Sequence, residues 1–153
     1  MLDKANYMKQ GRDQYFVAMK VLLRDGAKLL ITHDIFGDWD IPGGRIRASE
    51  FETSLEAVIK RKMREELGVG IKYHLRGPKV FFRVARIEQA LGEEVHIFAV
   101  GFEAEYLGGE IKLGEHHDKM EWVDVKTFKP SDYFTGGWLK GINDYQAIVR
   151  QGN

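Results

Sequence analysis

The chain contains no cysteine among its 153 residues, and it has no long apolar run. Without cysteine there are no disulfide bonds, thiolate nucleophiles or cysteine-based zinc sites. Any metal ion must therefore be bound by carboxylate, imidazole or carbonyl groups. The chain lacks both the roughly 20 consecutive apolar residues of a membrane-spanning helix and the apolar block of an N-terminal secretory signal. We therefore expect a cytoplasmic protein without a membrane partner.

A net charge of one sign is also missing. Lysine plus arginine and aspartate plus glutamate number 23 each, which gives a formal net charge of zero. A nucleic-acid partner would need a positive surface to neutralise its phosphates, so we expect none. Local charges can still bind a small anionic molecule.

The length predicts one domain with a hydrophobic core of its own. A chain of this size buries roughly 70% of the surface that its unfolded form exposes. We expect a single domain over residues 1–153, with its core at about residues 15–125. The sequence leaves the oligomeric state open, a homodimer included.

Periodicity predicts a mixed set of strands and helices. Strand-forming runs cover residues 15–24, 28–34, 79–86, 95–106 and 120–125. A helix is expected to begin at a capping box of Ser49 and Glu52 and to stop at Gly68. A closing helix is expected over residues 138–151. This order predicts an α/β (α+β) fold in which helices sandwich a mixed β-sheet.

Two adjacent glutamates, Glu65 and Glu66, stand near the end of the first helix, which follows a glycine-rich loop at residues 39–44. On a helical wheel Glu66 points toward the apolar side, where an unpartnered carboxylate is costly. The alternative is a solvated charge run at a helix end. We favour a hard oxygen site for Mg²⁺ or Mn²⁺, which would neutralise phosphate oxygens and activate water.

This segment resembles the Nudix hydrolase family of the MutT-like kind. The family motif is a glycine, five residues, a glutamate, seven residues and then Arg-Glu-apolar-x-Glu-Glu-x-Gly-apolar. Gly44 and Glu50 match its beginning, and Arg61–Val69 matches its end except at Lys62. With the flanking strands, the resemblance spans about residues 15–125.

The resemblance implies a Nudix-type domain that hydrolyses phosphate-linked bonds with a divalent metal. By resemblance, the metal ligands are Gly44, Glu65 and Glu66. The catalytic residues are Glu66 and Arg61, together with a base from a loop near the end of the domain.

The chain departs from the motif in the spacing between Glu50 and Arg61. Ten residues separate them where the family has seven. Three extra residues are close to one helical turn, which we place at the start of the helix. We therefore expect Glu50 to lie too far from Arg61 to brace it.

A second departure is Lys62, which stands where the family has a glutamate that helps to bind metal. Lys62 and Glu66 are four residues apart, so an ion pair between them is natural on a helix. Such a pair would compete with the metal. The alternative is that Lys62 extends outward into solvent.

The general base is expected in the loop at residues 114–118. Glu115 and His117 are rival candidates, since either can take a proton. The alternative is an ordinary polar loop before a strand. The spacing of Glu115, His117, Asp118 and Trp122 is similar to the GDP-mannose mannosyl hydrolase branch of the family, which suggests nucleoside-diphosphate sugars as a substrate class.

Substrate contacts are less clearly marked. Phe36 could stack on a base, although strand aromatics belong more often to the core. Arg45, Arg83 and Arg86 could bind phosphate, although such arginines are more often surface cations.

Three functions follow from these residues. The first is divalent-metal-dependent hydrolysis of a nucleoside diphosphate linked to another group, with water as nucleophile. The second is glycosyl-bond hydrolysis of a nucleotide sugar. The third is a sensor that binds such a nucleotide derivative without hydrolysing it, because Lys62 has replaced a metal ligand.

Overall fold

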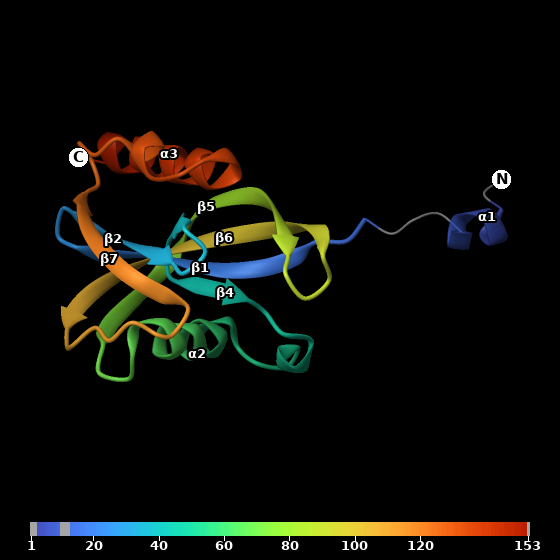
Figure 1. Cartoon of the computed structure of the whole chain (residues 1–153), viewed down its shortest axis with the longest axis horizontal. Helices are drawn as coiled ribbons and strands as arrows, with labels where there is room; N and C mark the ends of the chain where they lie inside the picture. Colours follow the sequence, from blue (N-terminus) through green and yellow to red (C-terminus); the bar gives the residue numbers. More distant parts are fainter. Residues whose placement is uncertain (1–2, 10–12, 153) are drawn as a thin grey trace.

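The computed structural model describes residues 3–9 and 13–152 (Figure 1). The helices are α1 (Lys4–Lys9), α2 (Leu55–Leu67) and α3 (Gly136–Gln151), and short 3₁₀ helices cover Ala48–Glu50 and Pro130–Asp132. The strands are β1 (Phe16–Asp25), β2 (Lys28–Asp34), β3 (Trp39–Asp40), β4 (Gly43–Arg45), β5 (Lys72–Glu88), β6 (Glu93–Gly108) and β7 (His117–Asp124).

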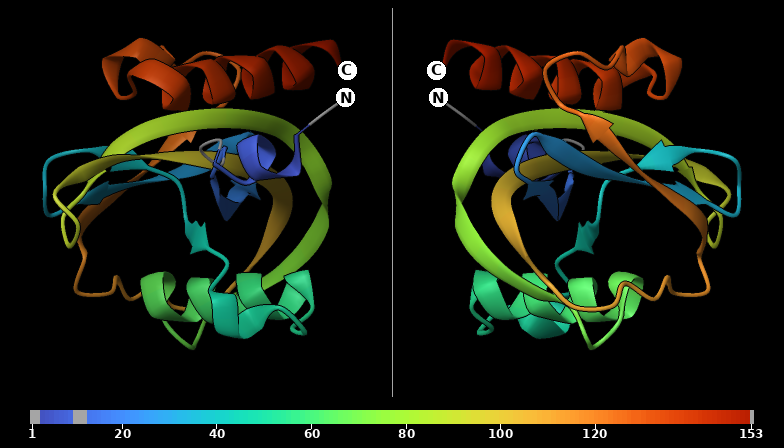
Figure 2. Two further views of the ribbon diagram at one scale, coloured as in Figure 1. Left: turned by 90° about the vertical axis from the view of Figure 1, so that its right-hand side faces the viewer. Right: turned by 90° about the vertical axis from the view of Figure 1, so that its left-hand side faces the viewer.

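The strands form one mixed sheet. Its main order is β3-β2-β1-β6-β5, with β4 added beside β1 and β7 beside β2. The β1–β6 pair is parallel, and the other pairs are antiparallel. The sheet curls, and α3 covers one face while α2 lies against the other (Figure 2). The predicted fold class, a mixed sheet between helices, is confirmed.

Alternation along β1 supplies both faces of the sheet with core residues. Ala18 and Leu22 pack in the cluster beneath α3, together with Ile142 and Tyr145 of that helix. Residues of β1 at the intervening positions, Met19, Val21 and Leu23, pack with the buried face of α2. A strand that is apolar on both faces is the expected result for the central position of a sheet covered on both sides.

Helix α2 begins later than the sequence predicted. Ser54, not Ser49, is its N-cap, and the Ser54 side chain accepts a hydrogen bond from the backbone N–H of Ala57. The predicted capping box of Ser49 and Glu52 is therefore wrong, because that segment forms the 3₁₀ helix and a turn instead. The helix ends at Gly68, as predicted, with φ of 92°.

The other predicted elements lie at their predicted places: β1 and β2 agree with the prediction to within one residue, and the later strands begin earlier than predicted. β5 begins seven residues before the predicted start at residue 79, and β6 and β7 also extend beyond the predicted runs. The closing helix α3 covers the predicted range and adds Gly136 and Gly137. Within residues 3–9 and 13–152, no helix is both long and apolar enough to cross a membrane.

Candidate functional site

The glycine-rich segment approaches β1 and α2 more closely than a side chain would permit. Gly43 has a φ of 120°, and a Cβ there would clash with the Met19 carbonyl. A Cβ at Gly44 would clash with the side chain of Lys62. Both glycines belong to the short strand β4, which pairs with β1. The sequence predicted a loop at this place.

Glu66 is the buried carboxylate of the site. Its side chain is 12% exposed, in agreement with its predicted place on the helical wheel. Its Oε2 accepts a hydrogen bond of 2.7 Å from the backbone N–H of Gly43. Burial raises the pKa of Glu66, although the positive charge of Lys20 works in the opposite direction. The carboxylate is thus fixed directly beneath the glycine-rich segment.

Glu65 is more exposed and is surrounded by cations. Its Oε2 contacts Lys62 Nζ at 3.2 Å, and its Oε1 contacts Arg61 Nη1 at 3.2 Å and Arg47 Nη2 at 3.4 Å. Partial burial opposes ionisation, but the hydrogen bonds from Lys62 and Arg61 outweigh it and lower the pKa of Glu65. Glu65 is therefore a charged carboxylate.

Lys62 lies between the two carboxylates. Its Nζ is 3.9 Å from Glu66 Oε1, so the predicted ion pair is present. The contact with Glu65 is shorter, because Glu66 is turned toward the backbone of Gly43. The Lys62 side chain is 21% exposed, so it does not extend fully into solvent.

The expectation that Glu50 lies too far from Arg61 is wrong. Arg61 Nε and Nη2 each donate a 2.7 Å hydrogen bond to the Glu50 carboxylate, and Nη2 also reaches the Arg45 carbonyl. The three extra residues lie outside α2, in the 3₁₀ helix and the turn after it. This turn brings Glu50 back to the helix. The two hydrogen bonds from Arg61 lower the pKa of Glu50 from 4.5 to about 2.

The Glu50–Arg61 pair predicts a specific loss of stability in acid. Because the pKa of Glu50 in the folded state is about 2, below the ordinary 4.5, the contribution of its charge is present above pH 4.5 and is lost as the pH falls through 2. We expect Glu50→Gln to lower Tm at neutral pH, and we expect this difference from the wild type to shrink as the pH falls through 2. Thermal unfolding across this pH range measures it. Glu52→Gln is the control, and a difference between wild type and Glu50→Gln that does not shrink between neutral pH and pH 2 would contradict the assignment.

Two further charged residues, Lys20 and Asp40, support the glycine-rich segment. Lys20 is only 3% exposed, and its Nζ lies 3.1 Å from Asp40 Oδ1 and 2.9 Å from the Gly43 carbonyl oxygen. The Gly43 residue is therefore held through its carbonyl by Lys20 and through its N–H by Glu66. Sequence reasoning missed this pair, although a lone lysine inside an apolar strand was a signal for it.

A cavity of about 580 Å³ opens beside Asp40. It lies between the segment before β4, the end of β5 and the start of α3, and aromatic side chains of Trp39, Tyr133 and Trp138 line it. Trp39 and Tyr133 meet edge to face at 5.1 Å. The predicted stacking residue Phe36 also lines this cavity. Aromatic walls of this kind suit a planar base.

The arginines predicted to bind phosphate are not brought together. Arg86 lines the cavity, whereas Arg45 and Arg83 do not. Arg45 lies over the Phe16 ring and contacts Glu88 Oε2 at 3.1 Å. Their roles in substrate binding stay predictions.

The segment before β7, where the general base is expected, is hydrogen-bonded to the end of α2. Backbone N–H groups of Lys112 and Gly114 donate to the carbonyls of Leu67 and Glu66, at 2.9 and 3.0 Å. These bonds satisfy carbonyls that a helix end leaves free. The loop therefore passes beside the glutamates.

The two candidate bases have different environments, and His117 is the first residue of β7 where the sequence predicted a loop. Glu115 is 91% exposed. In the described part of the chain, His117 Nδ1 is buried and has no hydrogen-bond partner. Asp118 contacts His33 Nδ1 at 2.6 Å, so it is engaged with a different histidine.

The donor set for a metal is small. Among residues 3–9 and 13–152, no group of three acidic or histidine side chains is arranged to hold an ion. Glu65 and Glu66 do converge on one cation, the ammonium of Lys62. Two carboxylates about a shared positive charge suit Mg²⁺ or Mn²⁺ chemically. They fit such an ion provided that Lys62 moves aside.

A NUDIX domain is recognised over residues 14–139. None of the curated proteins matches the chain. Among solved structures, the chain is similar to the MutT protein from Methanosarcina mazei Go1, with 20% identity, a TM-score of 0.70, and coverage of 94% of this chain and 99% of that one. It is similar to an ADP-ribose pyrophosphatase from Streptococcus suis 89-1591, with 13% identity, a TM-score of 0.60, and coverage of 92% and 96%. It is also similar to a UDP-X diphosphatase, with 18% identity, a TM-score of 0.59, and coverage of 99% and 73%.

Proposed function

Because the chain belongs to the Nudix hydrolase family, we propose that it hydrolyses a nucleoside diphosphate linked to another group, with a divalent cation and water as the nucleophile. The observation that carries this proposal is the placement of Glu66. It is buried, fixed to Gly43 and adjacent to Glu65, next to a segment that leads into an aromatic cavity. The cavity is lined by Asp40, three residues before Gly43, so a carboxylate pair and a base-sized cavity lie at the two ends of one short segment, which suits cleavage of a polyphosphate chain.

Glu65 and Glu66 would hold Mg²⁺ or Mn²⁺, with the carbonyl of Gly44 as a further ligand. The bound ion supplies charge neutralisation at the phosphates and activation of water. Arg61 keeps Glu65 in place through its Nη1 and is itself held by Glu50. Lys20 and Asp40 keep the backbone of Gly43 in position from the other side.

The 580 Å³ cavity is the proposed place of the nucleoside. Trp39, Tyr133 and Trp138 offer aromatic rings to a base, and Phe36 lines the same cavity as an exposed ring. The similar proteins named ADP-ribose pyrophosphatase and UDP-X diphosphatase support a nucleoside diphosphate linked to another group as the substrate class.

We expect the general base in the loop at residues 114–118, with His117 favoured over Glu115. The buried, unpaired Nδ1 of His117 supports this choice within the described residues, while Glu115 extends into solvent. Histidines ordinarily titrate near pH ~6.5 and glutamates near ~4.3, so the acid limb of kcat/KM distinguishes the two classes. We expect His117→Gln to lower kcat/KM and to change its acid limb. Undiminished rates in His117→Gln and a loss in Glu115→Gln would assign the role to Glu115.

The proposal is tested with a panel of nucleoside diphosphate sugars and ADP-ribose, assayed with Mg²⁺, with Mn²⁺ and with EDTA. We expect metal-stimulated release of a nucleoside monophosphate. Release of free sugar with an intact nucleoside diphosphate would instead indicate the glycosyl-bond reaction. Binding without release of any product would indicate the sensor, the alternative that Lys62 favours.

A further inference from the structure

Lys62 is a confined ammonium group within the site. Its side chain packs against Gly44, where an added Cβ would push the end of the lysine side chain aside, and only about a fifth of it is exposed. The glycine leaves a space that the lysine fills. The ammonium is therefore held under the glycine-rich segment, close to where the phosphates of the proposed substrate would lie.

The Lys62 ammonium has hydrogen-bonding capacity left over. An ammonium group carries three donors. Among the described residues, only Glu65 accepts a hydrogen bond from Lys62, at 3.2 Å. Glu66 Oε1, at 3.9 Å, is beyond hydrogen-bond distance. Donors thus remain for an incoming anion.

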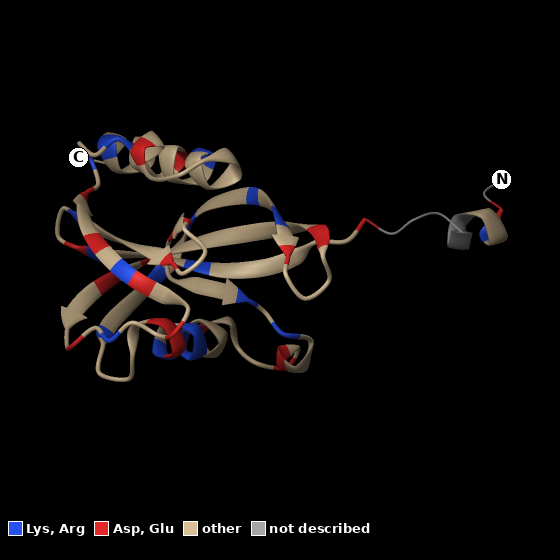
Figure 3. Cartoon of the chain, viewed as in Figure 1, with Lys and Arg blue, Asp and Glu red and all other residues tan. Residues whose placement is uncertain are grey.

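The formal charges around Lys62 already balance without a metal ion. The connected cluster consists of three cations and three carboxylates: Arg47, Arg61, Lys62, Glu50, Glu65 and Glu66. Figure 3 shows basic and acidic residues next to one another along α2. A glutamate in place of Lys62 would change the charge of this cluster by two units, from zero to minus two. Lys62 therefore supplies positive charge that an all-carboxylate site would need to take from a divalent ion.

We propose that the Lys62 ammonium binds a phosphate group of the substrate directly, as a built-in cation that takes over part of the charge neutralisation. Lysine binds phosphate as a compact point charge. It follows that the site binds a diphosphate group in the absence of any divalent cation. The identity of the ligand as a diphosphate rests on the proposed function, but the binding does not require turnover.

The test uses inorganic pyrophosphate, which contains the diphosphate group without a base or sugar. Its binding to the whole chain is measured by calorimetry in EDTA. We expect the wild type to bind, Lys62→Gln to bind about 10-fold or more weakly, and Lys62→Arg to retain most of the affinity. Thermal unfolding confirms that each variant is folded.

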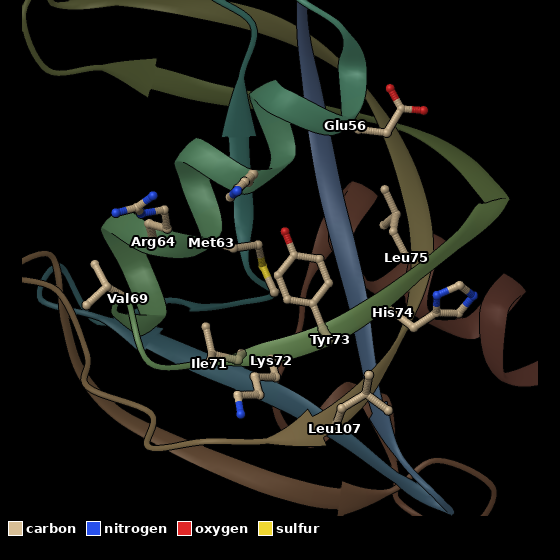
Figure 4. Close-up of a pocket in the computed structure, with 11 residues that line it drawn as sticks. Glu56, Met63, Arg64, Val69, Ile71, Lys72, Tyr73, His74, Leu75 and Leu107 are labelled. Carbon is tan, nitrogen blue, oxygen red and sulfur yellow. The ribbon is translucent and has the colours of Figure 1, made fainter.

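The matched control is Lys60→Gln, which removes the same charge from the same helix. Lys60 lines a separate groove of about 650 Å³ between α2 and β5. Met63, Arg64 and Tyr73 line the same groove (Figure 4). That groove contains none of the six charged residues of the cluster. We expect Lys60→Gln to bind pyrophosphate as the wild type does.

The outcomes separate this inference from the proposed function. If the wild type fails to bind pyrophosphate in EDTA, or if Lys62→Gln and Lys60→Gln weaken binding equally, the inference is overturned. Metal-stimulated turnover of the nucleotide panel could still succeed in that case. Conversely, metal-free binding that depends on Lys62, without turnover of any nucleotide, supports this inference and rejects the hydrolase.

Discussion

Glu66→Gln is expected to reduce metal-dependent turnover by about 100-fold or more, while the protein stays folded. Residues that only support metal ligands already change affinity or activity 10- to 100-fold, so a proposed ligand should match or exceed about that effect. The amide oxygen of glutamine can still accept the hydrogen bond from the N–H of Gly43. Only the charge is removed, so we expect Tm to be preserved. Initial rates at sub-saturating Mg²⁺ and thermal unfolding measure the two effects.

Matched variants distinguish the loss of a metal ligand from the loss of the hydrogen-bond acceptor for Gly43. Glu66→Ala also removes the acceptor for Gly43, and an unsatisfied buried N–H costs about 1–3 kcal/mol, so this variant should unfold at lower temperature. Glu56→Gln removes an exposed charge from the first turn of the same helix and should be neutral. Glu65→Gln should lose turnover as Glu66→Gln does. Wild-type rates in Glu66→Gln at sub-saturating Mg²⁺ would remove Glu66 from the metal site.

Local patterns explain why most of the fold could be predicted. Alternating or continuous apolar runs located β1, β2 and the later strands, because burial of a sheet face dictates such runs. The predicted start of α2 was wrong because two serines, Ser49 and Ser54, compete for the N-cap position, and both are followed by residues that can form a helix. Ser54 stands directly before the residues that pack on the sheet, so tertiary packing selects it over Ser49.

The candidate site was predictable where one helix sets the geometry. The burial of Glu66 and its proximity to Lys62 follow from helical spacing alone. Helical spacing does not predict contacts between segments that are distant in the sequence. The Glu50–Arg61 pair was missed because the extra residues were assigned to the helix, whereas they form a turn outside it.

The Lys20–Asp40 pair shows a different limit of sequence reasoning. These residues are 20 positions apart, and they meet through the sheet: β3 pairs with β2 and places Asp40, while β4 pairs with β1 and brings the Gly43 carbonyl to the same ammonium. No local sequence pattern predicts this contact. The buried lysine is stabilised by two oxygen partners and by the ring of Trp138 at 5.1 Å.

Lys62→Glu is expected to tighten Mg²⁺ binding on the order of 10-fold or more. The substitution removes an ammonium that contacts Glu65 at 3.2 Å and Glu66 at 3.9 Å, and it adds a carboxylate beside both. Lys62→Ala removes the competitor without adding a ligand and should give a smaller gain. The expected order of Mg²⁺ affinity is therefore glutamate, then alanine, then the native lysine, measured by calorimetry at fixed pH and salt.

Lys60→Glu controls for the general effect of added negative charge, because it makes the same charge change on the same helix outside the cluster. It should leave Mg²⁺ affinity close to that of the wild type. Lys62→Glu should at the same time weaken metal-free pyrophosphate binding, because the built-in cation is gone. The two affinities thus move in opposite directions only if one position serves both the metal and the phosphate. If Lys62→Glu bound Mg²⁺ no better than the wild type, Lys62 would not compete for the glutamates.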